Sequence, residues 1–229
     1  MPLDLADAVR VSASRISKEL FVFDLDGTLI DATEDIIAAV NHTLTHFKRP
    51  HLTRPEIVIH IGHGVRNLLQ NTLGLGGAEF EPAMEIMLSY YYDHCLETTQ
   101  LYPAVGETLK TLYEKKKKLS VCTNKSIKHT ERILHGFKIR DYFTTVVGGN
   151  SFPERKPHPM GLNHILAENR IPAVHAVMVG DSAVDIAVGK AVGLTTVGCT
   201  YGLRPLTEVQ QARPDFLLNR FDDLLYHFH

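Results

Sequence analysis

The sequence predicts an α/β protein, in which a Rossmann-like parallel sheet has helices on both faces and carries an inserted all-helical cap. An apolar, β-forming segment at residues 20–23 precedes about seventy residues of purely helical pattern. From Tyr102 onward, short apolar strands alternate with helical segments, which is typical of a parallel sheet. We therefore expect three parts: a discontinuous core in 18–30 and 101–229, a cap in 31–100 and an N-terminal extension in 1–17.

The expected cap is a series of helices. An acidic segment that suits a helix N-terminus is followed by apolar residues at helical spacing over 36–47. Pro50 and Pro55 interrupt this pattern, because proline lacks the backbone N–H that a helix interior needs. Two further helical patterns follow, over 65–69 and 80–95. No strand is expected between the first strand and Tyr102.

The rest of the chain is expected to supply the remaining strands of the sheet and the helices that cover it. Glycine, proline and asparagine mark the turns between these segments. We expect helices near 105–112, 127–135, 159–169 and 183–192, and strands near 119–124, 144–149, 176–180, 195–198 and 215–217.

Composition narrows the functional class. The chain has 229 residues, of which 44% are hydrophobic and 22% charged, and its formal net charge is −2. This balance gives no reason to expect nucleic acid or a membrane as a partner, and no apolar stretch reaches 18 residues. The three cysteines lack metal-ligand spacing, and the N-terminus lacks a signal-peptide core, so we expect a cytoplasmic protein. Both a monomer and a homodimer remain open.

The segment Asp24-Leu25-Asp26-Gly27-Thr28 is the most informative feature. It follows the first predicted strand, and ligands of open α/β sheets bind at strand ends. Two carboxylates so close together repel each other unless a cation or a shared proton lies between them. Taken alone, the two acids could merely cap the next helix while Gly27 turns the chain.

Later strand ends favour the functional interpretation. Thr123 and Asn124 follow one strand and suit an oxyanion, while Lys156 is a point charge suited to phosphate. Asp181 follows another strand, and Asp185 lies one helical turn further on. Because parallel strands end at one edge of a sheet, we expect these groups to converge with the first two acids. Such a cluster of carboxylates fits a hard cation such as Mg²⁺.

These segments, in this order, resemble the four motifs of the haloacid dehalogenase superfamily. The motifs are Asp24-Leu-Asp-Gly-Thr28, Thr123-Asn-Lys125, Lys156-Pro-His-Pro159 and Gly180-Asp-Ser-Ala-Val-Asp185. The helical insertion after the first motif resembles the C1-type cap of that superfamily. Two further stretches, Ile61-Gly-His-Gly-Val-Arg66 and Val197-Gly-Cys-Thr-Tyr-Gly202, are similar to its phosphoglycolate phosphatase branch and to the pyrophosphatases related to it.

The resemblance implies a phosphatase mechanism. Asp24 would be the nucleophile that forms an aspartyl-phosphate, and Asp26 the general acid and then the general base. Lys156 would neutralise charge on the nucleophile and on the phosphoryl group, whose oxygens Thr123 and Asn124 would hold.

The resemblance also implies a metal site. Asp24, Asp181 and the backbone carbonyl of Asp26 would bind Mg²⁺. Asp185 would act less directly, through water or through Lys156.

The substrate implied is a small phosphorylated metabolite, with phosphoglycolate as the first candidate. Inorganic pyrophosphate, another small phosphate ester and a mutase reaction remain alternatives, as does a non-catalytic sensor of phosphate ligands. Dehalogenase chemistry does not use Asp26, and a phosphonatase has alanine there, so both are disfavoured. The cap turn Gly62-His63-Gly64 and Arg66 are expected to contact the substrate, and Arg66 could pair with its carboxylate. Alternatively, Arg66 is an ordinary surface residue.

Overall fold

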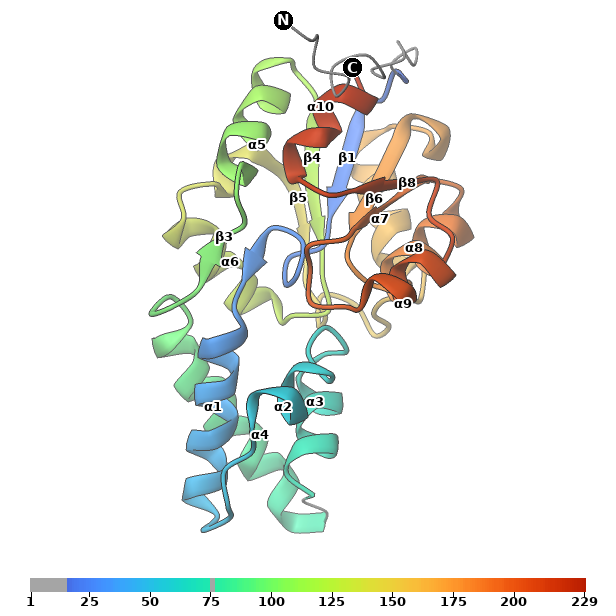
Figure 1. The fold of residues 1–229 in the computed structure, drawn as a ribbon. Coiled ribbons are helices and arrows are strands. Elements are labelled where there is room, and N and C mark those ends of the chain that lie inside the picture. The colour runs from blue at the N-terminus through green and yellow to red at the C-terminus, as the bar shows by residue number, and fades with distance from the viewer. Residues whose placement is uncertain (1–15, 75–76) are drawn as a thin grey trace, which may run out of the picture.

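Six parallel strands form the central sheet, in the order β5-β4-β1-β6-β7-β8 (Figure 1). The computed structural model describes residues 16–74 and 77–229. The predicted fold class is confirmed. In sheet order the strands are β5 (Phe143–Val147), β4 (Lys118–Cys122), β1 (Leu20–Phe23), β6 (Ala176–Gly180), β7 (Thr195–Cys199) and β8 (Phe216–Leu218).

Both faces of the sheet are buried, because successive side chains of a strand point to opposite faces. Phe21 and Phe23 of β1 pack into one hydrophobic cluster. Leu20 and Val22 of the same strand pack into a second cluster on the other face. The continuous apolar run that predicted this strand therefore serves two cores at once.

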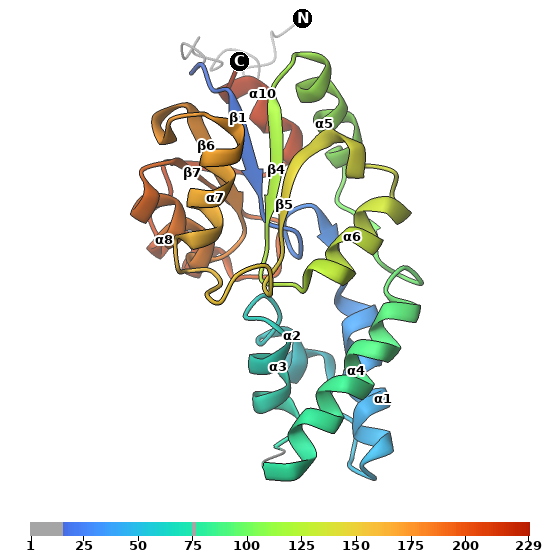
Figure 2. The same ribbon diagram turned by 180° about the vertical axis from the view of Figure 1, so that it is seen from behind.

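Helices cover both faces of the sheet (Figures 1 and 2). The second cluster lies beneath α7 (Met160–Asn169) and α8 (Ala183–Val192), which contact the strands beside β1. The other face is covered by α5 (Val105–Glu114), α6 (Ile127–Gly136) and the C-terminal α10 (Leu224–His227). Within the described residues, no helix is long and apolar enough to cross a membrane.

The cap lies beyond the C-terminal ends of the strands (Figures 1 and 2). A two-stranded antiparallel ribbon, β2 (Ile30–Asp31) with β3 (Gln100–Leu101), joins it to the core. The sequence did not predict this ribbon, because two residues are too few for a periodic pattern. The cap helices are α1 (Thr33–His46), α2 (Arg54–Val58), α3 (Val65–Thr72) and α4 (Phe80–His94).

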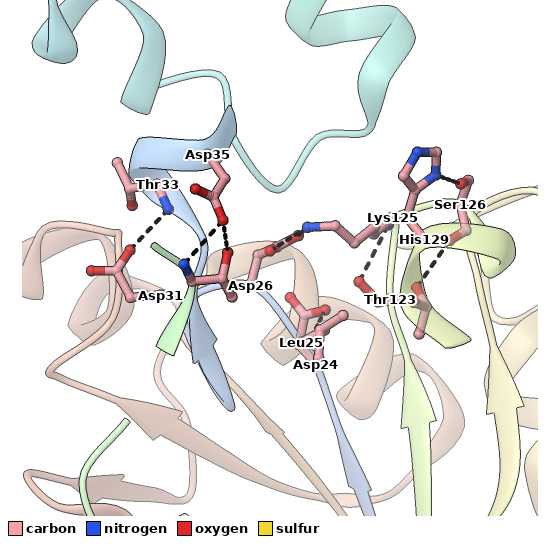
Figure 3. Close-up of polar contacts among 12 residues, drawn as sticks. Asp24, Leu25, Asp26, Asp31, Thr33, Asp35, Thr123, Lys125, Ser126 and His129 are labelled. Carbon is pink, nitrogen blue, oxygen red and sulfur yellow. Dashed lines mark hydrogen bonds and ion pairs between the residues drawn. The ribbon is translucent and has the colours of Figure 1, made fainter. Parts of the chain in front are cut away.

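Asp35 fixes the junction between cap and core (Figure 3). Its buried carboxylate accepts hydrogen bonds from the backbone N–H and the hydroxyl of both Thr98 and Thr99. These residues follow α4 and precede β3, so one carboxylate ties the chain that enters the cap to the chain that leaves it. Hydrogen bonds to a charged acceptor are the stronger kind.

Two local expectations need correction, and a third lies mostly outside the described residues. Pro55 does not simply interrupt the chain: it lies in the first turn of α2, where a helix needs no N–H from it. Two short helices, α9 (Leu206–Gln211) and α10, were not predicted. Of the expected N-terminal extension, residues 1–15 lie outside the described residues.

Candidate active site at the junction of core and cap

Asp24 and Asp26 lie directly beyond the end of β1, which is flanked by β4 and β6 (Figure 3). The ladder of β1 continues as far as the first acid, because the Asp24 N–H donates to the carbonyl of Val179 at 2.9 Å. The Asp24 Oδ1 atom accepts a hydrogen bond from the N–H of Leu25 at 2.7 Å. Both carboxylates are buried. The backbone therefore fixes the direction of Asp24 before any ligand binds.

Gly27 allows a second acidic segment to approach this loop. Its φ of 83° lies in the left-handed region, which favours glycine. A Cβ atom at this position would overlap the carboxylate of Asp181. The glycine of the first motif thus makes room for an acid of the fourth.

Lys156 lies between two carboxylates. Its Nζ atom is 3.0 Å from Oδ1 of Asp24 and 2.6 Å from Oδ1 of Asp185. Burial opposes the charge on Lys156, but the attraction of Asp185 and Asp24 outweighs it and raises the pKa of the ammonium. The lysine is therefore a fixed positive charge at the nucleophile that the sequence predicts.

Asp181 completes a cluster of three acids. Burial, together with repulsion from Asp185 and Asp24, raises the pKa of the Asp181 carboxyl to about 8. Its Oδ2 atom accepts a hydrogen bond of 2.7 Å from the N–H of Leu203. Ligand atoms of Asp24, Asp181 and Asp185 all lie within 4.8 Å of one another. One lysine does not balance three acids, so the cluster favours a cation.

Thr123 and Asn124 follow β4, and both are buried. They differ in the hydrogen-bond donors that their side chains have available for a ligand. The Thr123 oxygen accepts from the N–H of Lys125 at 3.2 Å, so its own hydrogen is available to a ligand. The Asn124 amide donates instead to the carbonyls of Gly62 and Lys156, each at 3.1 Å. The side chain of Asn124 therefore links the cap turn to the core, and its amide has no free donor for a phosphoryl oxygen.

Lys125 belongs to the site, although we did not predict it. Its Nζ atom lies 2.6 Å from Oδ1 and 2.8 Å from Oδ2 of Asp26 (Figure 3). Burial disfavours the charge on Lys125, yet the Asp26 carboxylate and Tyr91 of the cap raise the pKa of the ammonium. Its position in the sequence could have identified it as a site residue, because Lys125 stands in the same short loop as Thr123 and Asn124.

A pocket opens between the sheet edge and the cap. Asp24, Asp26, Thr123 and Lys125 form its core side. On the cap side, the turn residues Gly62 and Gly64 line it together with apolar side chains and aromatic rings. These are Ile36, His60, Ile61, Val65, Leu68, Met87, Leu88 and Tyr91.

His63 and Arg66 do not line this pocket in the described structure. Arg66 instead forms an ion pair of 2.8 Å with Glu81, and its guanidinium lies 5.0 Å from the centre of the Phe80 ring. Of the four cap residues that we expected to contact substrate, the structure thus brings only the two glycines to the site.

Comparison with known families matches the part of the chain that contains the site. The family model of the haloacid dehalogenase-like hydrolases matches residues 21–199, which include both acids after β1 as well as Lys156, Asp181 and Asp185.

The chain belongs to the haloacid dehalogenase-like hydrolase family.

Relatives of known name support a narrower resemblance within this family. The chain is 33% identical over 215 residues to the phosphoglycolate phosphatase of Vibrio vulnificus strain YJ016, with 90% of this chain and 94% of the relative covered. It is also 33% identical to phosphoglycolate phosphatase 1 of Pseudomonas aeruginosa, with 93% of this chain and 80% of the relative covered. The resemblance to this branch that the motifs indicated is confirmed.

A solved structure shows the same fold. The crystal structure described as a predicted phosphoglycolate phosphatase from Haemophilus somnus 129PT superposes with a TM-score of 0.87 at 32% identity. The superposition covers 91% of this chain and 96% of that one.

The residues present fit the divalent metal that this hydrolase family implies. Three buried carboxylates are hard oxygen donors, and a bound cation would offset the burial and the mutual repulsion that raise the pKa of Asp181. The Asp26 carboxylate is held by Lys125, so Asp26 would contribute its backbone carbonyl. Asp185 contacts Lys156 directly, and its carboxylate also belongs to the three-acid cluster.

Proposed function

We propose that the protein is a magnesium-dependent phosphatase that hydrolyses a small phosphate monoester, and that 2-phosphoglycolate is its substrate. The observation that carries this proposal is the buried arrangement of Asp24, Lys156 and the acids Asp181 and Asp185 at the sheet edge. We place the activity in the cytoplasm, because all three cysteines are buried and unpaired, as in a reducing compartment.

Asp24 is the proposed nucleophile. Its carboxylate attacks phosphorus, the bond from phosphorus to the ester oxygen breaks, and an aspartyl-phosphate forms. The Leu25 N–H and the Lys156 ammonium both contact Oδ1, so the carboxylate is oriented in advance. Lys156 and the free hydroxyl hydrogen of Thr123 stabilise the charge on the phosphoryl oxygens.

Asp26 is the proposed acid and base. It lies two residues from the nucleophile and lines the same pocket. In the first step Asp26, in its protonated form, passes its proton to the leaving alcohol oxygen. In the second it removes a proton from the water that attacks the aspartyl-phosphate, which releases inorganic phosphate and restores Asp24.

A metal would be held by Asp24, Asp181, Asp185 and the carbonyl of Asp26. When bound, Mg²⁺ neutralises charge so that an anionic substrate can approach an anionic nucleophile. The remaining chemistry belongs to the side chains named above.

The cap side of the pocket favours an organic leaving group over a second phosphate. Ile36, Val65, Leu68 and Met87 are apolar and suit carbon atoms. An apolar wall on this side of the pocket favours a small phosphate ester, whose leaving group contains carbon, over pyrophosphate. The names of the relatives favour phosphoglycolate among such esters.

Steady-state kinetics test the proposal. Turnover is measured for 2-phosphoglycolate, pyrophosphate, sugar phosphates and nucleotides, each with Mg²⁺ and with an excess of chelator. We expect the highest kcat/KM for 2-phosphoglycolate and loss of activity with chelator. Absence of turnover on every substrate would favour a ligand sensor, whereas a preference for pyrophosphate would reject the assigned substrate.

A further inference from the structure

We infer that Lys125 determines specificity: its ammonium binds a carboxylate on the leaving part of the substrate, and the Tyr91 hydroxyl is the second donor to that group. This inference rests on the proposed phosphatase function. It assigns recognition of the substrate to a pair of residues, one from the core and one from the cap.

The position of Lys125 supports this role. Among the described residues, Lys125 is the only lysine or arginine that lines the pocket between cap and core. Its side chain is only 8% exposed, so its charge acts in a poorly solvated environment, where electrostatic interactions are strong. The neighbouring cation Lys156 is held between Asp24 and Asp185 on the core side.

The donors of Lys125 are not exhausted. An ammonium group has three N–H donors, and the two oxygens of Asp26 account for two of them. The ammonium lies 4.9 Å from the centre of the Tyr91 ring, which helps to hold it in place. The third donor is shared between the nearby Tyr91 hydroxyl and any ligand that enters the pocket.

Tyr91 provides an independent observation. Its side chain is buried on α4 and lines the pocket, and its hydroxyl lies near the Lys125 ammonium without forming a hydrogen bond of good geometry. An unsatisfied buried polar group is costly, and such groups are often completed by a ligand. A carboxylate oxygen between Lys125 and Tyr91 would satisfy both.

Other polar groups of the pocket are less suited to this role. Both ring nitrogens of His129 already have partners, Ser126 at 2.5 Å and the carbonyl of Leu88 at 3.0 Å. Arg66 pairs with Glu81 outside the pocket. Apart from His60, the remaining cap wall is largely apolar.

Distance fits the length of a short substrate. The proposed acid Asp26 must contact the ester oxygen, and Lys125 lies one hydrogen bond from Asp26. A carboxylate attached through a single carbon lies about 3 Å from the ester oxygen, which is also about the length of one hydrogen bond. The substrate class is therefore a phosphate ester whose alcohol carries a carboxylate on the adjacent carbon.

The test compares two substrates that differ only in this group. In 2-hydroxyethyl phosphate, a neutral hydroxymethyl group replaces the carboxylate of 2-phosphoglycolate. Lys125→Met should lower the ratio of kcat/KM for 2-phosphoglycolate to that for 2-hydroxyethyl phosphate by roughly tenfold to a hundredfold, as expected for loss of a hydrogen bond between charged groups. Equal losses on both substrates would mean that Lys125 only positions Asp26, and would overturn the inference.

A second variant keeps the inference falsifiable if Lys125→Met does not fold. Tyr91→Phe removes only the hydroxyl and keeps the ring, so the fold should persist, and we expect the same ratio to fall by about threefold or more. An unchanged ratio would overturn the role of Tyr91. If the Lys125 variant also failed to fold, the unchanged ratio would overturn the whole inference.

Lys128→Met is the matched control, because the Lys128 ammonium stacks on Tyr92 and does not line the pocket. Its ratio should equal that of the wild type. A wild-type enzyme that hydrolyses neither substrate would refute the proposed function itself, which is a different result from equal losses in the variant.

Discussion

The ammonium of Lys156 lies 2.6 Å from the carboxylate of Asp185, and both side chains are almost completely buried. The same ammonium lies 3.0 Å from Asp24. Since Asp181 is also within this cluster, a single lysine partly compensates three acids. Breaking a buried ion pair on one side is strongly destabilising, because it leaves an uncompensated charge. Lys156 should therefore support both the reaction and the metal-free fold.

We predict that Lys156→Met abolishes phosphatase activity and lowers the free energy of unfolding of the metal-free protein by about 3–5 kcal/mol. Urea denaturation monitored by circular dichroism measures the second effect. Lys110→Met is the control, since Lys110 makes only an exposed contact of 4.0 Å with Glu114 and should change little. Added Mg²⁺ should restore part of the lost stability, and a variant as stable as the wild type would contradict the role given to Lys156.

Asp24→Asn should reduce turnover below about 1% of wild type, because an amide of nearly the same shape is a far weaker nucleophile. Hydrolysis of an aryl phosphate measures the loss, and a thermal melt shows whether the fold remains. The amide can still accept the hydrogen bond from Leu25. A folded variant with substantial remaining turnover would exclude Asp24 as the nucleophile.

His129 should make stability depend on pH. Burial, followed by the nearby cations Lys125, Lys128 and Arg132, lowers the pKa of His129, although its bond to the Leu88 carbonyl opposes this. The carbonyl only accepts, so Nε2 carries the proton of the neutral ring. Below about pH 6.5 the unfolded chain binds a proton that the folded protein resists, so stability falls with falling pH.

The contribution of His129 to this slope is at most about 1.4 kcal/mol per pH unit. We expect His129→Gln to flatten the decline between pH 7 and 5, as measured by urea denaturation at several pH values. His135→Gln is the matched control on the same helix, because His135 is exposed. Parallel slopes for the wild type and His129→Gln would show that His129 does not resist protonation.

The strands and most helices could be predicted because their apolar patterns are long and flanked by clear turn residues. The helix expected over 183–192 is α8 with the same ends. The β2–β3 ribbon could not be predicted, since each strand has only two residues and its partner lies about seventy positions away. Hydrophobic periodicity depends only on residues close together in the sequence, so it does not detect strand pairing between the two ends of the inserted cap.

The core acids and Lys156 could be predicted for a different reason: a parallel sheet carries all its strand ends to one edge. The contacts of Asn124, Lys125 and Arg66 depend on side-chain direction and on the position of the cap. Asn124 is turned to Gly62, and Lys125 to Asp26. No spacing rule within one segment contains this information, because each partner comes from a distant part of the chain.

Arg66→Ala provides the last test, because sequence and structure lead to different expectations for it. The turn before α3 indicated a carboxylate contact and a KM for 2-phosphoglycolate raised by roughly tenfold in the variant. In the structure Arg66 pairs with Glu81, and the two side chains are 47% and 63% exposed. Exposed ion pairs contribute about 0–1 kcal/mol, so we expect little loss of stability.

The kinetic expectation follows from the pocket, which Arg66 does not line. KM for 2-phosphoglycolate should change by less than about twofold in Arg66→Ala, while Lys125→Met loses selectivity for the carboxylate. Initial rates on 2-phosphoglycolate and 2-hydroxyethyl phosphate for both variants measure this difference. If Arg66→Ala instead raised KM tenfold for the anionic substrate alone, Arg66 would have to reach the pocket in the complex, and the carboxylate would belong to Arg66 rather than to Lys125.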